Sequence, residues 1–173
     1  MNRIFRYRNL RSLQIEDASS MLRWMHDPDT SKWFQRDFSS MSESDVLDFI
    51  EKSKDKSESI HLAVVDQDDS YLGTISLKHI DDNLSGEYAI SMTHAAQGTG
   101  AAEKATKAIL DYAFCKLDLH RVYLNVRKNN VRAIRFYEKI GFTLEGVARD
   151  ALYTEEGFVD LLWFAILKPE WKE

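Results

Sequence analysis

The stretch from Asn125 to Phe142 reads Asn-Val-Arg-Lys-Asn-Asn-Val-Arg-Ala-Ile-Arg-Phe-Tyr-Glu-Lys-Ile-Gly-Phe. Polar residues follow a strand here, and the pattern then predicts a helix that begins at Asn130 and stops at Gly141, where glycine serves as a left-handed cap. Residues three and four apart share one face of a helix. We therefore expect Asn130, Ala133 and Tyr137 along one side of it.

A second motif lies about thirty residues upstream, at Gln97-Gly98-Thr99-Gly100-Ala101-Ala102, before a helix expected from about Ala101 to Leu117. A helix N-terminus presents unpaired backbone N–H groups and a partial positive charge, which suit a pyrophosphate. Gly98 and Gly100 let the backbone approach such a ligand closely. Glu103 opposes an anion there unless its carboxylate points outward.

The composition limits the class of protein. The chain has 173 residues, 44% of them apolar and 12% aromatic, and this length indicates a single domain over residues 1–173. The net charge is -5, without a dense basic run, which argues against a nucleic-acid partner. The sequence has neither a signal peptide nor an apolar run of the ~20 residues that a membrane span needs, so we expect no membrane partner and a cytoplasmic location.

The cysteine and the histidines predict no metal site. Cys115 is the only cysteine, so neither an intramolecular disulfide nor a cysteine-rich zinc site is available, and its apolar neighbours predict a buried helical thiol. The five histidines are scattered without the paired spacing of metal ligands.

The order of elements predicts an α+β, or mixed α/β, fold. A first strand is expected from about Arg3 to Leu10, followed by a helix that Asp17 opens and Pro28 ends. Ser42 and Asp45 have the spacing of a capping box before a second helix. Further strands are expected near residues 60–65, 71–80, 87–92, 121–126, 143–147 and 158–167. The helix after the glycine loop precedes the strand at 121–126, and the helix that begins at Asn130 follows it.

Together, the two motifs resemble the acetyl-coenzyme A binding motifs of the GNAT N-acetyltransferase superfamily, Q/R-x-x-G-x-G/A and N-x-x-A-x-x-x-Y-x-x-x-G-F. The second is matched at every fixed position. The resemblance implies a GNAT-like acyl-CoA N-acyltransferase fold, a central, mostly antiparallel twisted sheet flanked by helices, with acetyl-CoA as cosubstrate and no metal. Residues 145–150 and 157–163 resemble the branch that contains ribosomal-protein N-terminal, spermidine and aminosugar-nucleotide acetyltransferases.

The resemblance also implies which residues bind the cofactor. The glycine loop would cradle the pyrophosphate, and a strand edge would hydrogen-bond the pantetheine arm as an added strand. Alternative structural roles are a helix N-cap for Asn130 and a packed aromatic for Tyr137. The implied cofactor-binding residues are Ile90, Ser91, Met92, Gln97, Gly98, Thr99, Gly100, Ala101, Ala102, Asn130, Ala133 and Tyr137.

Three groups are the catalytic candidates for acetyl transfer to an amine. Glu87 would accept the proton of the amine, directly or through water, and an ordinary strand carboxylate is the alternative for it. The backbone N–H of Met92 would stabilise the tetrahedral oxyanion, and Tyr137 would protonate the departing thiolate.

The acceptor remains open from the sequence. The groove implied by the resemblance would be lined by Trp24, Trp33, Phe34, Glu87 and Tyr153, with Asp27, Arg149 and Asp160 as further candidates. The expected function is an acetyl-CoA-dependent N-acetyltransferase acting on a small amine, an aminosugar nucleotide or a protein N-terminus. A non-catalytic acyl-CoA-binding or sensing module is the alternative, and a homodimer is open. A dinucleotide-binding fold is excluded because G-x-G-x-x-G is absent.

Overall fold

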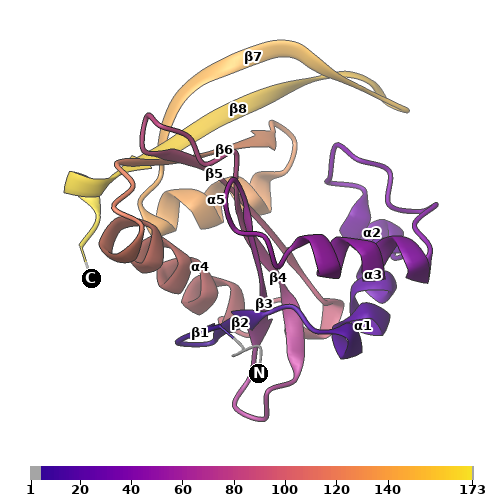
Figure 1. The fold of residues 1–173 in the computed structure, drawn as a ribbon. Coiled ribbons are helices and arrows are strands. Elements are labelled where there is room, and N and C mark those ends of the chain that lie inside the picture. The colour runs from indigo at the N-terminus through magenta and orange to yellow at the C-terminus, as the bar shows by residue number, and fades with distance from the viewer. Residues whose placement is uncertain (1–4, 173) are drawn as a thin grey trace.

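The computed structural model describes residues 5–172, which form one eight-stranded sheet in the order β1-β2-β3-β4-β5-β6-β8-β7 (Figure 1). Neighbouring strands are antiparallel except β5 and β6, which are parallel. The mostly antiparallel sheet and the α+β class are as predicted. The strands are β1 (Arg6–Tyr7), β2 (Leu10–Ser12), β3 (Ile60–Val65), β4 (Tyr71–Lys78), β5 (Ser85–Met92), β6 (Arg121–Arg127), β7 (Thr143–Thr154) and β8 (Gly157–Leu167).

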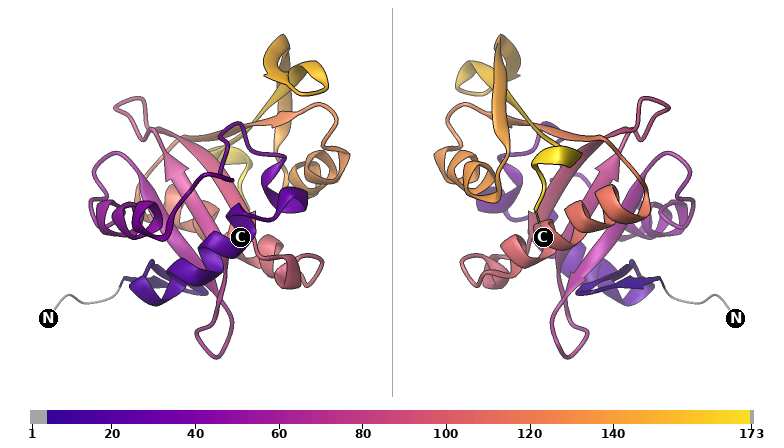
Figure 2. Two further views of the ribbon diagram at one scale, coloured as in Figure 1. Left: turned by 90° about the vertical axis from the view of Figure 1, so that its right-hand side faces the viewer. Right: turned by 90° about the vertical axis from the view of Figure 1, so that its left-hand side faces the viewer.

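Helices cover both faces of the sheet, as the two side views in Figure 2 show. Alternation along β3 explains this, because Leu62 and Val64 belong to one apolar core and Ala63 and Val65 to the other. The first core packs against α4 and α5, and the second against α1 and α3. The helices are α1 (Ala18–Met25), α2 (Pro28–Ser31), α3 (Glu43–Lys52), α4 (Ala101–Asp111) and α5 (Val131–Ile140).

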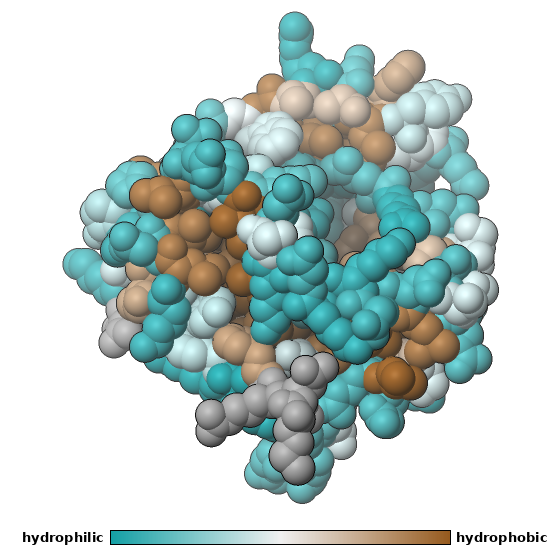
Figure 3. Space-filling model, in the orientation of Figure 1, coloured by the Kyte–Doolittle hydropathy of each residue, from teal (hydrophilic) through white to brown (hydrophobic). Residues whose placement is uncertain are grey.

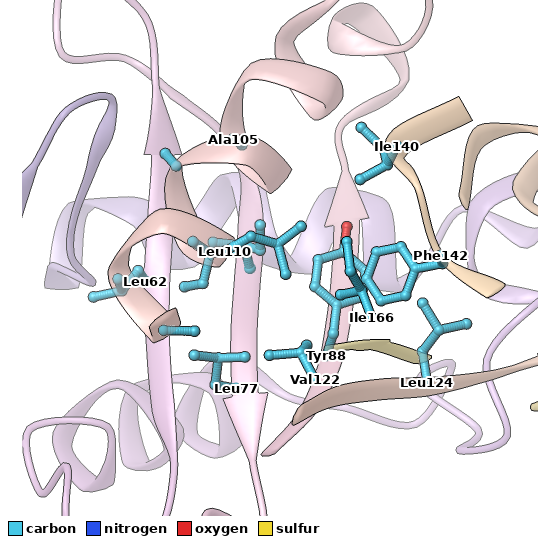
Figure 4. Close-up of a cluster of buried hydrophobic side chains, with 14 of the residues drawn as sticks. Leu62, Leu77, Tyr88, Ala105, Leu110, Val122, Leu124, Ile140, Phe142 and Ile166 are labelled. Carbon is cyan, nitrogen blue, oxygen red and sulfur yellow. The ribbon is translucent and has the colours of Figure 1, made fainter. Parts of the chain in front are cut away.

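The core beneath α4 and α5 fixes both helices against the sheet (Figure 4). Leu110 of α4 and Leu77 of β4 are fully buried in it. A polar link crosses this core: the hydroxyls of Tyr88 and Thr106 are 2.8 Å apart, and Thr106 donates to the Ala102 carbonyl at 2.7 Å. This link ties β5 to the first turn of α4.

The N-terminal part differs from the prediction in two places. Over its described residues, the expected strand to Leu10 is a hairpin of β1 and β2, because Arg8 turns the chain with a φ of 53°; residues 3 and 4 lie outside the described residues. Pro28 does not end α1. It opens α2, whose N-cap is Asp27, since the first turn of a helix needs no N–H from proline.

The capping box of α3 is confirmed, whereas the burial of Cys115 is not. Ser42 N donates to Asp45 Oδ2 at 2.8 Å, and Asp45 N donates to Ser42 Oγ at 3.2 Å. Beyond α4 the chain continues as a π-helical turn over Tyr112–Lys116. This wider turn buries Ala113 and Phe114 and leaves Cys115 exposed.

β5 and β6 part within the sheet. β5 pairs with β4 from Lys78↔Glu87 to Gly73↔Met92, but it pairs with β6 only over Ser85–Glu87. β6 continues beside β8 as far as Arg127. The edge of β5 from Tyr88 to Met92 therefore faces a gap in the sheet instead of a neighbouring strand.

Candidate active site

A cavity of about 440 Å³ opens where β5 and β6 part. Its walls come from β4, β5, the end of β6, α1 and the loop that follows α2. Figure 3 shows this face of the molecule hollowed between the helices α1–α3 and the arch of β7 and β8. Eight of the predicted site residues line the cavity: Trp24, Trp33, Phe34, Glu87, Ile90, Ser91, Asn130 and Tyr137.

Tyr137 lies on α5 at the wall of the cavity. Its ring meets Tyr88 edge-on, with centroids 5.9 Å apart and planes at 86°, and also contacts Phe142. Burial raises the pKa of Tyr137 to about 12. The phenol therefore stays protonated at neutral pH, as a proton donor must.

Asn130 performs the structural role predicted as its alternative and also lines the cavity. Its Oδ1 accepts a hydrogen bond from Ala133 N at 3.3 Å, so it caps α5. Gly141 closes the helix with a φ of 115°. Ala133 packs against the main core and lies outside the cavity wall.

Glu87 lies on β5 directly opposite Lys78 of β4. Its carboxylate is 3.6 Å from Lys78 Nζ and 3.4 Å from His79 Nε2, and its side chain is 18% exposed. These two neighbours orient a carboxylate that still reaches the cavity. The position suits a proton acceptor for a bound amine.

Met92 contributes its backbone. Thr93 N donates to Leu72 O at 2.8 Å, and because successive N–H groups of a strand point to opposite edges, Met92 N faces the gap. The Met92 side chain is buried and does not line the cavity. A Cβ added at Gly73 would lie only 2.4 Å from Ser91 O, so this glycine allows β4 to hold the end of β5 closely.

The glycine loop lies outside the 440 Å³ cavity, at the start of α4. Gly98 and Gly100 have φ values of 75° and 85°, and a Cβ added to either would meet nothing within 4 Å. The N-cap residue Gly100 has no side chain to cap α4. Ala101 N donates to Thr99 Oγ1 at 3.4 Å, whereas the N–H groups of Ala102 and Glu103 have no partner among the described residues. Glu103 points away, toward Lys107 and Lys139, at 3.0 and 2.6 Å.

A second cavity of about 840 Å³ adjoins the first. The two share part of the loop after α2, including Trp33 and Phe34, and Tyr153 lines only the second. The other acceptor candidates lie elsewhere: Asp27 caps α2, Asp160 accepts from Asp150 N at 2.9 Å, and Arg149 lines neither cavity.

The sequence analysis missed the cationic side chains of the cavity, Arg36, Lys78 and Arg127, and its histidine, His61. Arg127 donates to Phe34 O at 2.8 Å. Alternation along β6, with Val122, Leu124 and Val126 buried, could have placed Arg127 on the opposite face; Arg36, in an irregular loop, gives no such signal.

His61 is a neutral side chain in the cavity wall. Its Nδ1 is 2.7 Å from Ser76 Oγ, and its ring meets Phe49 at 4.8 Å. Burial, followed by the charge of Lys78, lowers the pKa of His61 to about 4. The imidazole therefore carries no charge near pH 7.

Neither metal clusters nor membrane helices are found over residues 5–172. No three His, Cys, Asp or Glu side chains in this range are grouped so as to hold a metal ion. None of its helices is long and apolar enough to cross a bilayer.

The family model of the acetyltransferase (GNAT) domain matches residues 8–143. This chain belongs to the GNAT acetyltransferase family. Spermidine N(1)-acetyltransferase of Escherichia coli K12 is 35% identical over 144 residues, covering 79% of this chain and 73% of that protein. The putative ribosomal N-acetyltransferase YdaF of Bacillus subtilis is 35% identical over 106 residues, covering 61% and 58%.

A solved GNAT structure has the same fold. The spermidine N-acetyltransferase of Vibrio cholerae, in complex with CoA and spermine, superposes with a TM-score of 0.86 and 24% identity over 93% of this chain and 95% of that one. The fold of this chain, with its sheet open between β5 and β6, is therefore that of the GNAT acetyltransferases. The chain is an enzyme of the GNAT N-acetyltransferase type.

Proposed function

We propose that this enzyme transfers the acetyl group of acetyl-CoA to a primary amine by direct attack. The observation that supports it most is the parting of β5 and β6 beside the cavity that holds Glu87 and Tyr137. An open strand edge hydrogen-bonds an extended ligand, and the side chains of the cavity supply proton transfer.

The donor would lie along the gap. Ile90, Ser91 and Met92 would hydrogen-bond the pantetheine arm as a strand would, and the N–H groups of residues 97–102 would bind the pyrophosphate. The open space beside Gly98 and Gly100 and the outward turn of Glu103 support this assignment. Asn130 and Ala133, at the start of α5, would complete the proposed donor site.

The chemistry requires no covalent enzyme intermediate. The amine nitrogen bonds to the thioester carbon, and the carbon–sulfur bond then breaks. Glu87 accepts the proton lost by the amine, directly or through water, and Tyr137 protonates the coenzyme A thiolate. The N–H of Met92 would stabilise the oxyanion between these two steps.

The relatives support an amine acceptor of small size. The Escherichia coli relative is a spermidine acetyltransferase, and the Vibrio cholerae structure contains spermine. Trp33, Phe34 and Tyr153 would form the outer wall of the acceptor site. A homodimer stays a prediction.

The first experiment incubates the full-length protein with acetyl-CoA and single amines, and follows free coenzyme A thiol together with product mass. A product that gains one acetyl group establishes the reaction. A rise in the melting temperature with acetyl-CoA reports binding to the native state independently of turnover. Binding without turnover of any amine would favour the sensing module, and neither binding nor turnover would refute the donor assignment.

A further inference from the structure

The cavity beside β5 is cationic although the chain is acidic. The sequence has 28 Asp and Glu against 23 Lys and Arg. Among the residues that line the 440 Å³ cavity, Glu87 is the only carboxylate, whereas Arg36, Lys78 and Arg127 carry positive charges. Because Lys78 lies 3.6 Å from Glu87, the two arginines are the excess charge.

Arg127 is a guanidinium with unused donors. Over residues 5–172 the side chain of Arg127 makes one hydrogen bond, from its guanidinium to Phe34 O, and its Nε is buried without a partner. No carboxylate in that range lies within 4.0 Å of it. Burial lowers the pKa of Arg127, and the charge of Glu156 offsets only part of this effect.

Arg36 lies on the loop after α2 and lines the cavity. No carboxylate of the described residues lies within 4.0 Å of its guanidinium, although its charge contributes to the lowered pKa of Asp45. Its guanidinium lies over the Phe38 ring at 5.8 Å and approaches Met41 Sδ at 3.6 Å. Both arginines line the second cavity as well as the first, so they stand at the junction of the two. Figure 3 shows hydrophilic residues around the mouth of this hollow.

We propose that Arg36 and Arg127 bind an oxyanion of the acceptor, and that the acceptor is therefore a small amine that carries its own carboxylate or phosphate. This inference rests on the proposed function. A guanidinium offers several N–H donors in a plane that matches a carboxylate or phosphate. The amine would reach Glu87 and Tyr137 while its oxyanion stays at the junction.

The same charges disfavour a polyamine. Spermidine carries several positive charges, and within the first cavity these would face Arg36, Lys78 and Arg127 with Glu87 as the one compensating carboxylate; Asp37, Glu155 and Glu156 line the second cavity only. The cationic wall also lowers the pKa of the reacting amine, which makes its neutral, nucleophilic form more abundant. The proposed acceptor specificity of this chain thus differs from that of its spermidine-acetylating relatives.

Calorimetric titration of the CoA-saturated, full-length protein tests the proposal, because bound CoA keeps other anions from the donor site. Glucosamine 1-phosphate is compared with glucosamine, and β-alanine with β-alaninamide, so that phosphate and carboxylate are measured separately. We expect at least one anionic member to bind about tenfold more tightly than its neutral partner. Saturation by CoA is verified first, and its failure would refute the proposed function instead.

Three variants assign the effect to the arginines. Arg36→Gln and Arg127→Gln should each remove most of the preference for the anionic member over its neutral partner. Arg23→Gln, on the exposed side of α1 and outside both cavities, is the matched control for loss of one charge. Because Arg127 also holds Phe34 O, Arg36→Gln keeps the test valid if Arg127→Gln does not fold.

Several results would overturn the proposal. The best anionic amine should bind more tightly than spermidine and more tightly than a peptide N-terminus without acidic groups; tighter binding of either of these contradicts the proposal. Equal binding of the charged and neutral members, or an equal loss in Arg23→Gln, also contradicts it.

Discussion

The two halves of the site are built differently. The proposed donor half consists of backbone: the edge of β5, the loop at Gly98 and Gly100, and the capped start of α5. The acceptor half consists of side chains from segments far apart in the chain, such as Arg36, His61 and Arg127. Many different sequences can form the same backbone geometry, whereas each substitution in a cavity wall changes its shape or charge. The donor is thus set by the fold and the acceptor by the particular residues of this chain.

Tyr137 lies where the halves meet, and its removal should have the largest effect. Tyr137→Phe keeps the packing against Tyr88 and Phe142 but removes the proton donor. We expect kcat to fall about 100-fold while the KM for acetyl-CoA changes little. Steady-state kinetics measure both. Tyr112→Phe, outside the cavity, is the control, and an unchanged kcat in Tyr137→Phe would remove it from the acid role.

Gly73 tests whether backbone position matters to the donor half. In Gly73→Ala the new methyl group would lie 2.4 Å from Ser91 O, so the end of β5 must move. We expect a loss of about 1 to 3 kcal/mol in the free energy of unfolding, together with weaker acetyl-CoA binding. Urea unfolding and thermal shift measure these. In Gly146→Ala the Cβ meets nothing within 4 Å, and an equal loss there would contradict the steric reason.

Gly100 separates strain from ligand binding. Gly100→Ala and Gly157→Ala both place alanine at a positive φ, 85° and 103°, with no atom within 4 Å of the Cβ. Each should lose about 1 kcal/mol of stability through backbone strain. Only Gly100→Ala should also weaken acetyl-CoA binding, by about tenfold, because its loop is the proposed pyrophosphate site. Equal affinities for acetyl-CoA in the two variants would argue against the loop as the phosphate site.

His61 gives the smallest effect, confined to acid pH. Its folded-state pKa of about 4 lies below the ordinary value of 6.5, so the unfolded chain binds more protons between these values. Stability from the neutral imidazole is complete above pH 6.5 and is lost as the pH falls toward 4. Partial exposure reduces the effect to about 1 kcal/mol. In His61→Gln the free energy of unfolding should depend less steeply on pH between 6.5 and 4, as urea unfolding at a series of pH values would measure. An unchanged slope would assign the loss of stability to other groups.

Features that a few neighbouring residues determine could be predicted from the sequence, for a physical reason. Caps and glycines act over three to five residues, so Asn130, Gly141 and the Ser42 capping box could be found from spacing alone. The turn at Arg8 needs a positive φ from a residue type that rarely adopts one, and Cys115 depends on a π-helical turn. Neither leaves a local pattern in the sequence.

Arg36 and Arg127 show the limit for the site. They are 91 positions apart in the chain. Both line the two cavities because the loop after α2 lies against the end of β6, where Arg127 donates to Phe34 O. Tertiary packing brings such distant residues together, so the periodicity of either segment alone does not predict that they share a site. Trp24, in contrast, was expected to line the groove, and it is a buried residue in the cavity wall.

The short contact of β5 with β6 has a mechanical consequence. Three register pairs, Ser85↔Arg121 to Glu87↔Tyr123, are the whole ladder between the two parts of the sheet. A ligand that formed hydrogen bonds along Tyr88–Met92 would connect the two parts of the sheet beyond these three pairs and would restrict their relative motion. Amide hydrogens on both flanking strands should then exchange more slowly in the complex, so that the substrate completes the sheet that the polypeptide leaves unfinished.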